Sequence, residues 1–559
     1  MRCAIGLDFG TLSARAVVLE LETGQVLGQW VAAYDHGVLD THLPDGTRLP
    51  PDWALQHPGD YLTALEEIVP AAVREAGVLP EAVVGLGLDF TSSTVLPVEE
   101  GGEPLCLQER WKAEPHAWVK LWKHHGAQAQ ADRITDLIRQ AQPELLEAYG
   151  GKVSAEWLLP KVLETLEQAP AVWEAADKFL EAGDWLTARL TGQPAGSKAF
   201  AGYKALRQTA DGLPPSVLAR LDPRLAELPG KQPSRLLLPG EQAGGLTVQW
   251  ARRLGLLPGT PVAAAHIDAH AAVPAAGITG PGELLMILGT SGCDLVLGAE
   301  ARPVPGICGC VADGILPGFY GYEAGQTAVG DLFGWFVAQC VPEDYARQAR
   351  EQGVSLHQLL TAEASALHPG ESGLLALDWW NGNRSVLVDA ELTGLLVGMT
   401  LTTRPPEIYR ALLEAVAFGK RTILEAYETH GVPVRSLVAT GGIAGKNPLL
   451  LQIFADVLGR EIRVCAYEQA AAVGSALLGA AAAGRERGGF DSIGEAAAAL
   501  GRCTDRVYRP DPHRQAVYDR LYGAYSSLHE LFGRTLPVMK QLKALKRQTG
   551  SGKSAADTI

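Results

Sequence analysis

The chain opens with short apolar runs separated by polar turns, a pattern typical of β-strands. Residues 3–7 predict a strand, residues 8–13 a glycine-containing turn, and residues 16–21 a second strand. Residues 22–24 (Glu-Thr-Gly) then close a hairpin into residues 25–33. We therefore expect an antiparallel opening, which differs from the strand-to-helix opening of a dinucleotide-binding fold.

A similar layout returns in the middle of the chain, after residues 280–282 (Gly-Pro-Gly), the best boundary signal there. Residues 284–288 and 294–297 predict two strands that flank the turn at 289–292. The repetition predicts an α/β protein with two related halves, each offering one polar turn. We expect an amino-terminal domain at 1–279, a second domain at 280–485, and a helical extension with a tail at 486–559.

Other elements are expected around these turns. Val83–Phe90 and residues 262–266 predict strands, and residues 127–188 are mainly helical in pattern. Ser436–Thr440 predicts a strand that leads into two glycines and a helix from about Pro448. These elements alternate in the way that is typical of α/β proteins.

Composition and charge narrow the class of protein. Of the 559 residues, 47% are hydrophobic and 20% charged, and the net charge is −15, which disfavours nucleic acid or an anionic membrane as the main partner. The eight cysteines form no CxxC pair and the start has no apolar signal segment, so we expect a cytoplasmic protein. The Ala- and Gly-rich run at 470–484 is too short to span a bilayer and predicts a tightly packed internal helix.

The turn from Asp8 to Arg15 offers backbone N–H groups, hydroxyls, a carboxylate and a guanidinium within eight residues. Amide-lined turns bind phosphate oxygens, a carboxylate such as Asp8 can hold Mg²⁺ through water, and Arg15 can meet a phosphate. The alternative is a plain hairpin turn with a buried aspartate. A second such turn at 289–291 favours a phosphate clamp, and the absence of GxxxxGK[ST] disfavours a Walker site.

Asp268 lies between a predicted strand and an Ala-rich, helical stretch. A carboxylate at a helix start is stabilised in its charged form, which suits an acceptor for a hydroxyl proton, although it can also be a simple helix cap. His266 and His270 are four residues apart and would share a helix face, which leaves a metal site as a third interpretation. Asp268 would point away from that face, and no HExxH pattern is present.

Lys204 and Glu323 could hydrogen-bond a polyol or could be surface charges, and periodicity does not decide between these. Tryptophans are candidate sugar platforms, but packing is the commoner role for Trp157, Trp185, Trp379 and Trp380.

Taken together, these motifs resemble the FGGY carbohydrate kinase family, within the sugar kinase–Hsp70–actin superfamily. The resemblance covers roughly residues 3–480 and includes both phosphate turns. It also includes the adenosine motif at 439–448 and the long carboxy-terminal signature that begins at Gly394 and continues to Glu414. One departure occurs in the amino-terminal signature, where Lys161 is followed three residues later by Glu164 instead of tryptophan, which disfavours glycerol- and xylulose-type substrates.

The resemblance implies two RNase H-like domains with a catalytic cleft between them, using ATP and Mg²⁺. Several segments resemble the branch that phosphorylates L-ribulose to L-ribulose 5-phosphate in L-arabinose catabolism. It implies Asp268 as general base and sugar contacts from Ser92, Lys204, Asp268 and Glu323. It implies Asp8 on the magnesium side, and ATP contacts from Gly10, Thr11, Ser13, Arg15, Gly289, Thr290, Ser291, Gly441, Gly442 and Asn447.

Other functions use related features. D-ribulose or xylulose is the main competing substrate, because pocket shape and not motif spacing sets that choice. An Hsp70- or actin-like ATPase would use the same two turns, but a chaperone would need a separate peptide-binding module, and only about 80 residues follow position 480. A non-catalytic sugar sensor would not need Asp268. The oligomeric state is not encoded in these motifs, and base rates favour a homodimer.

Overall fold

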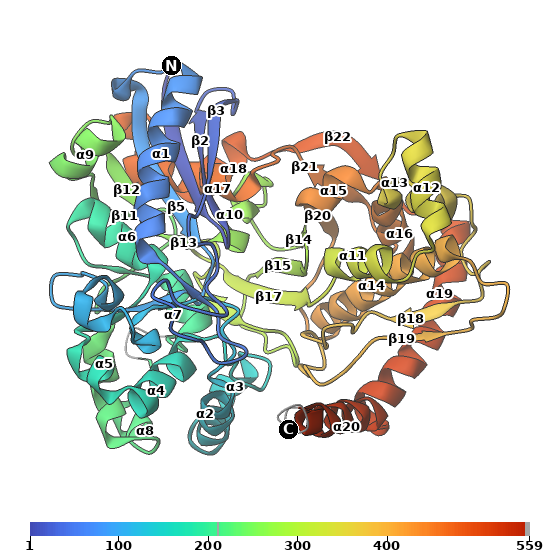
Figure 1. Ribbon diagram of the computed structural model, residues 1–559. Helices are drawn as coiled ribbons and strands as arrows, with labels where there is room; N and C mark the ends of the chain where they lie inside the picture. Colours follow the sequence, from blue (N-terminus) through green and yellow to red (C-terminus); the bar gives the residue numbers. More distant parts are fainter. Residues whose placement is uncertain (209–211, 554–559) are drawn as a thin grey trace.

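The computed structural model describes residues 1–208 and 212–553 and has two lobes side by side (Figure 1). The first lobe is built on a mixed sheet with strands in the spatial order β11-β12-β5-β1-β2-β3, and β13 also pairs with β5. The strands are β1 (Cys3–Phe9), β2 (Ser13–Glu20), β3 (Val26–Ala33), β5 (Val83–Phe90), β11 (Gln242–Gly245), β12 (Pro261–Ala263) and β13 (His266–Ile267).

The second lobe contains a sheet of the order β16-β17-β15-β14-β20-β21-β22. Its strands are β14 (Glu283–Leu288), β15 (Gly292–Gly298), β16 (Cys310–Ala312), β17 (Tyr320–Gln326), β20 (Ser436–Thr440), β21 (Ile462–Cys465) and β22 (Cys503–Tyr508).

The two sheets share one pairing pattern. From β3 to β11 the successive pairs are antiparallel, antiparallel, parallel, parallel and antiparallel. From β17 to β22 the sequence of pair types is the same. The hairpins β1–β2 and β14–β15 occupy equivalent places, so the related halves expected from the sequence are present in space.

Helix α17 (Ala470–Ala483) explains the long run of small residues. It packs on the first lobe's sheet, where a Cβ on Gly6, Gly85 or Gly87 would lie about 2 Å from backbone atoms of this helix. The helix backbone thus approaches the sheet more closely than any larger side chain would allow. The expected internal helix is confirmed, and it returns to the first lobe from late in the chain (Figure 1).

Helix α1 (Pro58–Ala76) covers the other face of that sheet, because Gly28 of β3 contacts Ala72 and Ala76 of this helix. Helices α9 (Val248–Leu254), α10 (Asp268–Ala275) and α18 (Ile493–Leu500) complete the first lobe around the sheet. The expected strand at 262–266 is divided between β12 and β13.

A largely helical insertion fills residues 127–204, and its first four helices share an apolar core with residues from the ranges 43–118 and 206–228. The helices are α2 (Gln128–Ala141), α3 (Pro143–Glu147), α4 (Leu158–Gln168), α5 (Pro170–Ala175), α6 (Ala182–Thr191) and α7 (Lys198–Lys204), with α8 (Pro215–Leu218) following. A small sheet joins β4 (Leu55–Gln56), β7 (Val119–Lys120), β6 (Val95–Val98) and β8 (Lys178–Glu181), and a strand pair is made by β9 (Gly196–Ser197) and β10 (Leu236–Leu237).

The second lobe is covered by helices and ends in a long carboxy-terminal segment. Its elements are α11 (Gly330–Gln339), α12 (Glu343–Gln352), α13 (Leu356–Ser365), β18 (Leu375–Leu377), β19 (Leu395–Val397), α14 (Pro405–Thr429), α15 (Gly442–Lys446), α16 (Pro448–Leu458), α19 (Pro512–Glu530) and α20 (Val538–Lys553). The tail expected at the end of the chain includes residues 554–559, which lie outside the part that the structure describes.

The described part of the chain contains no helix that is both long and apolar enough to cross a membrane. All eight cysteines, which lie within the described ranges, carry free thiols.

Candidate active site

Three buried or half-buried carboxylates meet at one edge of the first sheet. Strands β1, β5 and β13 run parallel, with Asp8 beside Asp89 and Asp89 beside His266 in the register. The carboxyl ends of parallel strands lie at the same edge, so Asp268, which follows β13 directly and begins α10, joins this group. Asp89 had no signal in the sequence, because it stands inside an apolar run that reads as an ordinary strand.

All three carboxyl groups have a pKa above the usual value for aspartate. Burial raises the pKa of Asp8, and the nearby Arg15 guanidinium opposes the rise, with Nη1 3.2 Å from Asp8 Oδ2. Burial and the charge of Asp8 raise the pKa of Asp89 well above its usual value. The same two causes raise the pKa of Asp268 to about 7, which is the range of a general base that works near neutral pH.

The first polar turn connects β1 to β2. It is closed by the Gly10 N–H, which donates to the Ser13 carbonyl at 3.0 Å. Arg15 reaches back to the Ser13 hydroxyl at 3.3 Å as well as to Asp8, so its charge is held over the turn. The Thr11 hydroxyl accepts a hydrogen bond from Trp122 Nε1 at 3.0 Å.

The second polar turn occupies the equivalent place between β14 and β15. Gly289 N–H donates to the Ser291 carbonyl at 3.0 Å, which repeats the closure of the first turn. Thr290 and Ser291 are exposed, and the Thr290 carbonyl accepts N–H groups from Val329 and Asp331 at the start of α11. Two turns of the same construction thus end equivalent strand pairs, one in each lobe.

The glycine pair of the adenosine motif follows β20, which runs parallel to β14 and therefore ends at the edge that carries the second turn. Gly441 has φ +93°, and a Cβ there would lie 2.6 Å from the Leu288 carbonyl oxygen. Gly442 is exposed, with open space where its side chain would be. Asn447 is buried, and its side-chain oxygen accepts the Leu450 N–H at 3.0 Å as the cap of α16, which leaves its amide NH₂ for a ligand.

Lys204 and Glu323 come from different lobes and meet in a buried ion pair. Lys204 Nζ of α7 lies 3.2 Å from Glu323 Oε2 of β17, and His270 Nε2 of α10 lies 3.1 Å from the same oxygen. Arg384 also binds Glu323, from the loop after β18. Burial alone would raise the pKa of Glu323, but Lys204, Arg384 and His270 together hold it well below the usual value.

The contacts of this cluster decide one alternative left open by the sequence and add two residues to the candidate site. The interpretation of Lys204 and Glu323 as surface charges is wrong, because both side chains are buried. Arg384 and His270 were not identified from the sequence as partners of Glu323, since the contacts join residues 61 and 53 positions apart. Ser92 lies half-buried in the turn after β5, whose other three residues, 91, 93 and 94, are buried.

The structure also bears on the proposed metal site at His266 and His270 and on the tryptophans considered as sugar platforms. His266 lies in strand β13, so it does not form a helical pair with His270, although their ring centroids are 5.8 Å apart. Trp157, Trp185 and Trp379 are buried in three different apolar cores, which is packing and not a sugar platform. The fourth, Trp380, packs against one of these cores.

One group of side chains among the described residues could gather around a metal ion: His36, His57 and Asp60. The imidazole rings of His36 and His57 are stacked at 4.4 Å with an interplanar angle of 11°. His57 Nδ1 already accepts the Gly59 N–H at 3.0 Å as the cap of α1. Parallel rings cannot both direct their lone pairs at one ion, so we interpret this cluster as a helix cap.

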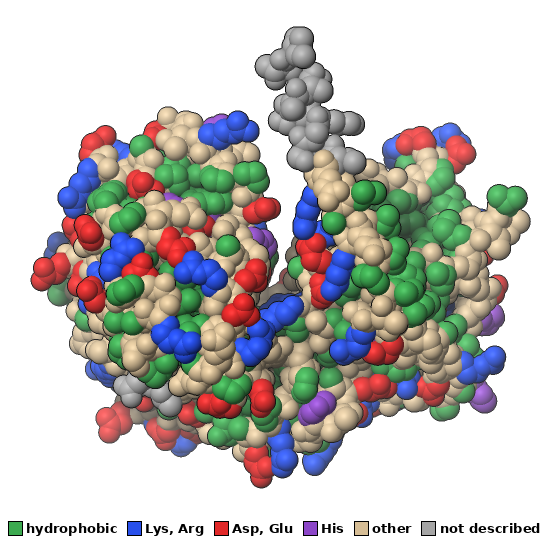
Figure 2. All heavy atoms as spheres, turned by 90° about the horizontal axis from the view of Figure 1, so that it is seen from below, with side chains coloured by type: hydrophobic (Ala, Val, Ile, Leu, Met, Phe, Trp, Pro, Cys, Tyr) green, Lys and Arg blue, Asp and Glu red, His purple; other side chains and the backbone are tan. Residues whose placement is uncertain are grey.

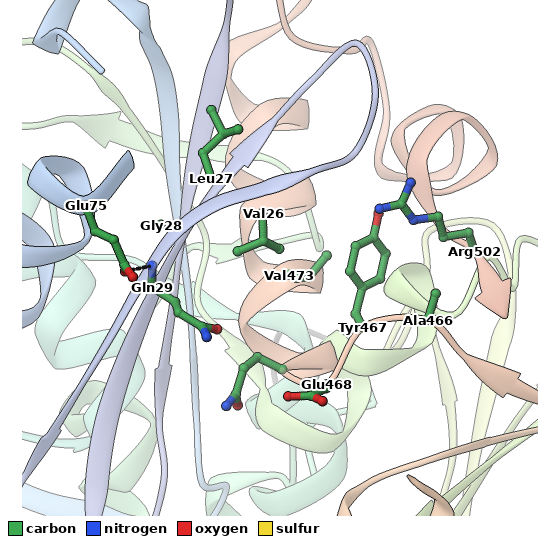
Figure 3. Close-up of a pocket in the computed structure, with 11 residues that line it drawn as sticks. Val26, Leu27, Gly28, Gln29, Glu75, Ala466, Tyr467, Glu468, Val473 and Arg502 are labelled. Atoms are coloured by element: carbon green, nitrogen blue, oxygen red, sulfur yellow. Dashed lines mark hydrogen bonds between the residues drawn. The ribbon is translucent and has the colours of Figure 1, made fainter. Parts of the chain in front are cut away.

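A deep groove separates the lobes when the molecule is seen from below, and charged side chains of both signs lie along it (Figure 2). A different hollow, of about 350 Å³, lies beside strand β3 (Figure 3). It is lined by Val26, Leu27, Gly28, Gln29, Glu75, Ala466, Tyr467, Glu468, Gln469, Val473 and Arg502. None of the candidate site residues belongs to this lining, so the strand-end carboxylates, and not this hollow, mark the candidate active site.

Comparisons with known proteins agree with this geometry. The amino-terminal domain model of the FGGY family of carbohydrate kinases matches residues 3–274, and the carboxy-terminal domain model matches residues 284–483. A ribulokinase from Halalkalibacterium halodurans is 51% identical over 546 residues, covering 97% of this chain and 97% of that protein. A ribulokinase from Geobacillus thermodenitrificans is 49% identical over 555 residues, covering 99% and 98%.

Solved structures establish the fold. Xylulose kinase from Rhodospirillum rubrum superimposes with a TM-score of 0.76 at 24% identity, covering 94% of this chain and 98% of that one. Plasmodium falciparum glycerol kinase with ADP has a TM-score of 0.73 at 16% identity, covering 94% and 98%. At these identities the likeness concerns the fold alone, and it confirms the expected two-domain α/β architecture.

Proposed function

The chain belongs to the FGGY family of carbohydrate kinases, and from this premise we propose that it transfers the γ-phosphoryl group of ATP to L-ribulose. The product is L-ribulose 5-phosphate, in L-arabinose catabolism. The reaction is supported most directly by Asp268, a carboxylate at a strand end whose pKa is raised to about 7. The choice of substrate is supported by ribulokinases that are about half identical over nearly the whole chain.

Phosphoryl transfer needs mainly positioning and charge neutralisation, and the two polar turns supply both. We assign the first turn, with Gly10, Thr11, Ser13 and Arg15, to phosphate oxygens of ATP. The exposed hydroxyls of Thr290 and Ser291, with the Gly289 amide, take the same role from the second lobe. Gly441 and Gly442 leave the backbone open to the adenosine, and the free amide of Asn447 is the remaining donor there.

The strand-end carboxylates fit a magnesium ion. Mg²⁺ prefers oxygen ligands and commonly binds through water, and Asp8 and Asp268 offer carboxylate oxygens at one edge. Asp89 Oδ1 is buried and has no hydrogen-bond partner among the described residues, whereas Oδ2 accepts the Ser475 hydroxyl at 2.6 Å. We assign Asp8 to the metal side, where the bound ion would neutralise charge on the phosphates.

Asp268 acts as the general base in this proposal. Its carboxylate accepts the proton of the sugar's terminal hydroxyl as that oxygen attacks the γ-phosphorus in line. The Ala269 N–H donates to Asp268 Oδ1 at 2.7 Å, which fixes the carboxylate and leaves Oδ2 for the substrate. A positioned base contributes about 10²–10⁴ in rate, equivalent to roughly 3–5 kcal/mol of barrier.

The buried cluster around Glu323 forms the sugar pocket in this proposal. Lys204 donates to hydroxyl or carbonyl oxygens of the ketopentose, Glu323 accepts from its hydroxyls, and Ser92 closes the pocket from the turn after β5. Because Lys204 and Glu323 belong to different lobes, sugar binding would couple to closure of the groove, and closure would exclude water from the phosphoryl group. The unpaired cysteines and the use of ATP fit the cytoplasm.

Release of ADP in a coupled assay, measured over a panel of sugars, tests the proposal. The panel contains L-ribulose, D-ribulose, D-xylulose, L-xylulose and glycerol, with a no-sugar control. We expect the highest kcat/KM with L-ribulose and little ADP release without sugar. A higher kcat/KM with D-ribulose or D-xylulose would overturn the substrate assignment, and no sugar-dependent release at all would overturn the reaction.

A further inference from the structure

A buried lysine and a buried glutamate form hydrogen bonds with the C=O and the N–H of one peptide unit in the turn that carries Ser92. The Ser93 carbonyl accepts a hydrogen bond from Lys161 Nζ at 2.6 Å. The N–H of the same peptide unit, on Thr94, donates to Glu181 Oε2 at 3.0 Å. Lys161 and Glu181 are 1% and 3% exposed, so water does not compete for either contact.

The turn itself is strained and closely tied to the catalytic edge. Ser93 has φ +60°, a left-handed conformation that costs a non-glycine residue on the order of 1 kcal/mol or more. The Thr94 hydroxyl donates to the Thr91 carbonyl at 2.8 Å, and the Thr91 N–H donates to the Phe9 carbonyl at 3.2 Å. Phe9 directly follows Asp8, so this last hydrogen bond fixes the turn beside the strand that carries the metal-side carboxylate.

Lys161 reaches the turn from α4 and also donates to the Leu121 carbonyl at 2.8 Å. None of the steps proposed for catalysis uses Lys161 or Glu181. Burying two charged groups costs about as much free energy as their attraction returns, so this arrangement has no stability advantage over a well-packed apolar one. The specific effect of this pair is to fix the orientation of the Ser93–Thr94 peptide.

We propose that Lys161 and Glu181 are positioning residues that clamp the Ser93–Thr94 peptide and thereby hold Ser92 in place for the ketopentose. The inference rests on the proposed function, in which Ser92 contacts the sugar. It also supplies a physical role for Lys161, the lysine that the amino-terminal family signature contains. The two residues act through the backbone of the turn and do not themselves touch the substrate.

The test compares Lys161→Met with Lys120→Met. Lys120 is a second buried lysine, 3% exposed, whose Nζ bonds to His116, Glu164, Thr165 and the Lys161 carbonyl and not to the peptide groups of the Ser92 turn. Both variants lose a buried ammonium group together with its hydrogen bonds, so both should have a lower urea midpoint. We expect Lys161→Met to raise the KM for L-ribulose about tenfold or more with the KM for ATP within about twofold, and Lys120→Met to leave both within about twofold.

A second pair of variants separates positioning from stability. Glu181→Gln keeps an oxygen that accepts the Thr94 N–H, so its sugar KM should stay within about threefold of the wild type. Combining it with Lys161→Met removes the uncompensated carboxylate, which should recover the urea midpoint without recovering the sugar KM.

Equal effects of Lys161→Met and Lys120→Met on the sugar KM, or recovery of that KM together with the midpoint, would overturn the inference. Failure of the proposed function would appear separately, as wild-type protein that releases no ADP with any pentulose, and would overturn the clamp with it.

Discussion

Lys204 Nζ lies 3.2 Å from Glu323 Oε2, although the two residues are 119 positions apart and belong to different lobes. Glu323 also binds His270 and Arg384, so one carboxylate is surrounded by three nitrogen-bearing side chains. The carboxylate is buried and yet its pKa is held well below the usual value, so it is ionised at neutral pH. In the proposed enzyme this pair is both the wall of the sugar pocket and a link across the groove.

Neutralising Glu323 should weaken sugar binding selectively. In Glu323→Gln the charge-assisted hydrogen bonds are lost, which costs about 1.5–3 kcal/mol and corresponds to a roughly 10- to 100-fold rise in the KM for L-ribulose. Lys204→Ala should act in the same direction. The control is Glu300→Gln, which neutralises an exposed carboxylate of the second lobe. Equal changes in the KM for sugar and for ATP would count against a sugar pocket here.

Replacing Asp268 should slow the chemical step without unfolding the protein. Asp268→Asn keeps the shape of the side chain and its hydrogen bond from the Ala269 N–H, but it cannot accept the hydroxyl proton. We expect kcat at saturating L-ribulose and ATP to fall by at least ~10², with an unchanged thermal midpoint. Asp505→Asn, on an exposed part of β22, is the control. Near-normal turnover would remove Asp268 from the role of base.

The two glycines of the adenosine motif should respond differently to alanine. Gly441→Ala forces a Cβ to 2.6 Å from the Leu288 carbonyl oxygen at φ +93°, so we expect a loss of about 1–3 kcal/mol of stability. Gly442→Ala meets open space and should leave stability within about 0.5 kcal/mol. It should nevertheless raise the KM for ATP severalfold, because its methyl group enters the space assigned to the adenosine. An unchanged ATP KM in this variant would contradict that placement.

Two buried histidines that precede the helical insertion, His116 and His124, should make the protein sensitive to acid. Burial lowers the pKa of His124 to about 4 and that of His116 to about 3, whereas both titrate near 6.5 in an unfolded chain. As the pH falls from about 6.5 to 4, the unfolded chain takes up protons that the folded protein refuses, so the free energy of unfolding decreases.

The dependence of the free energy of unfolding on pH tests the lowered pKa of His124. In His124→Gln, one such proton is removed, so stability lost between pH 6 and 5 should be smaller than in the wild type by about 1 kcal/mol. Urea unfolding followed by tryptophan fluorescence measures this loss, with His513→Gln, on an exposed turn of α19, as the control. An unchanged slope in His124→Gln would show that His124 is already protonated in the folded protein at these pH values.

The strands and turns were largely predictable because they depend on local sequence. Val83–Phe90 and Ser436–Thr440 have the bounds that we expect from the sequence. The repeated strand–turn–strand layout also predicted two related halves, and the matching pair types of the sheets confirm it.

The features that the sequence did not predict depend on contacts between residues that are far apart in the chain. The small residues at 470–484 indicated a closely packed helix, but only the glycine-lined face of the first sheet identifies its partner. Arg384 and His270 become recognisable only when β17 brings Glu323 beside them. Asp89 looks like any residue of an apolar strand until the register places it next to Asp8.

The most direct test of the proposed mechanism is a crystal structure of the ternary complex with L-ribulose, a non-hydrolysable ATP analogue and Mg²⁺. The mechanism predicts the terminal hydroxyl of the sugar within hydrogen-bond distance of Asp268 Oδ2 and in line with the γ-phosphorus held between the two polar turns. A complex in which that hydroxyl lies far from Asp268, or is approached by another base, would contradict it.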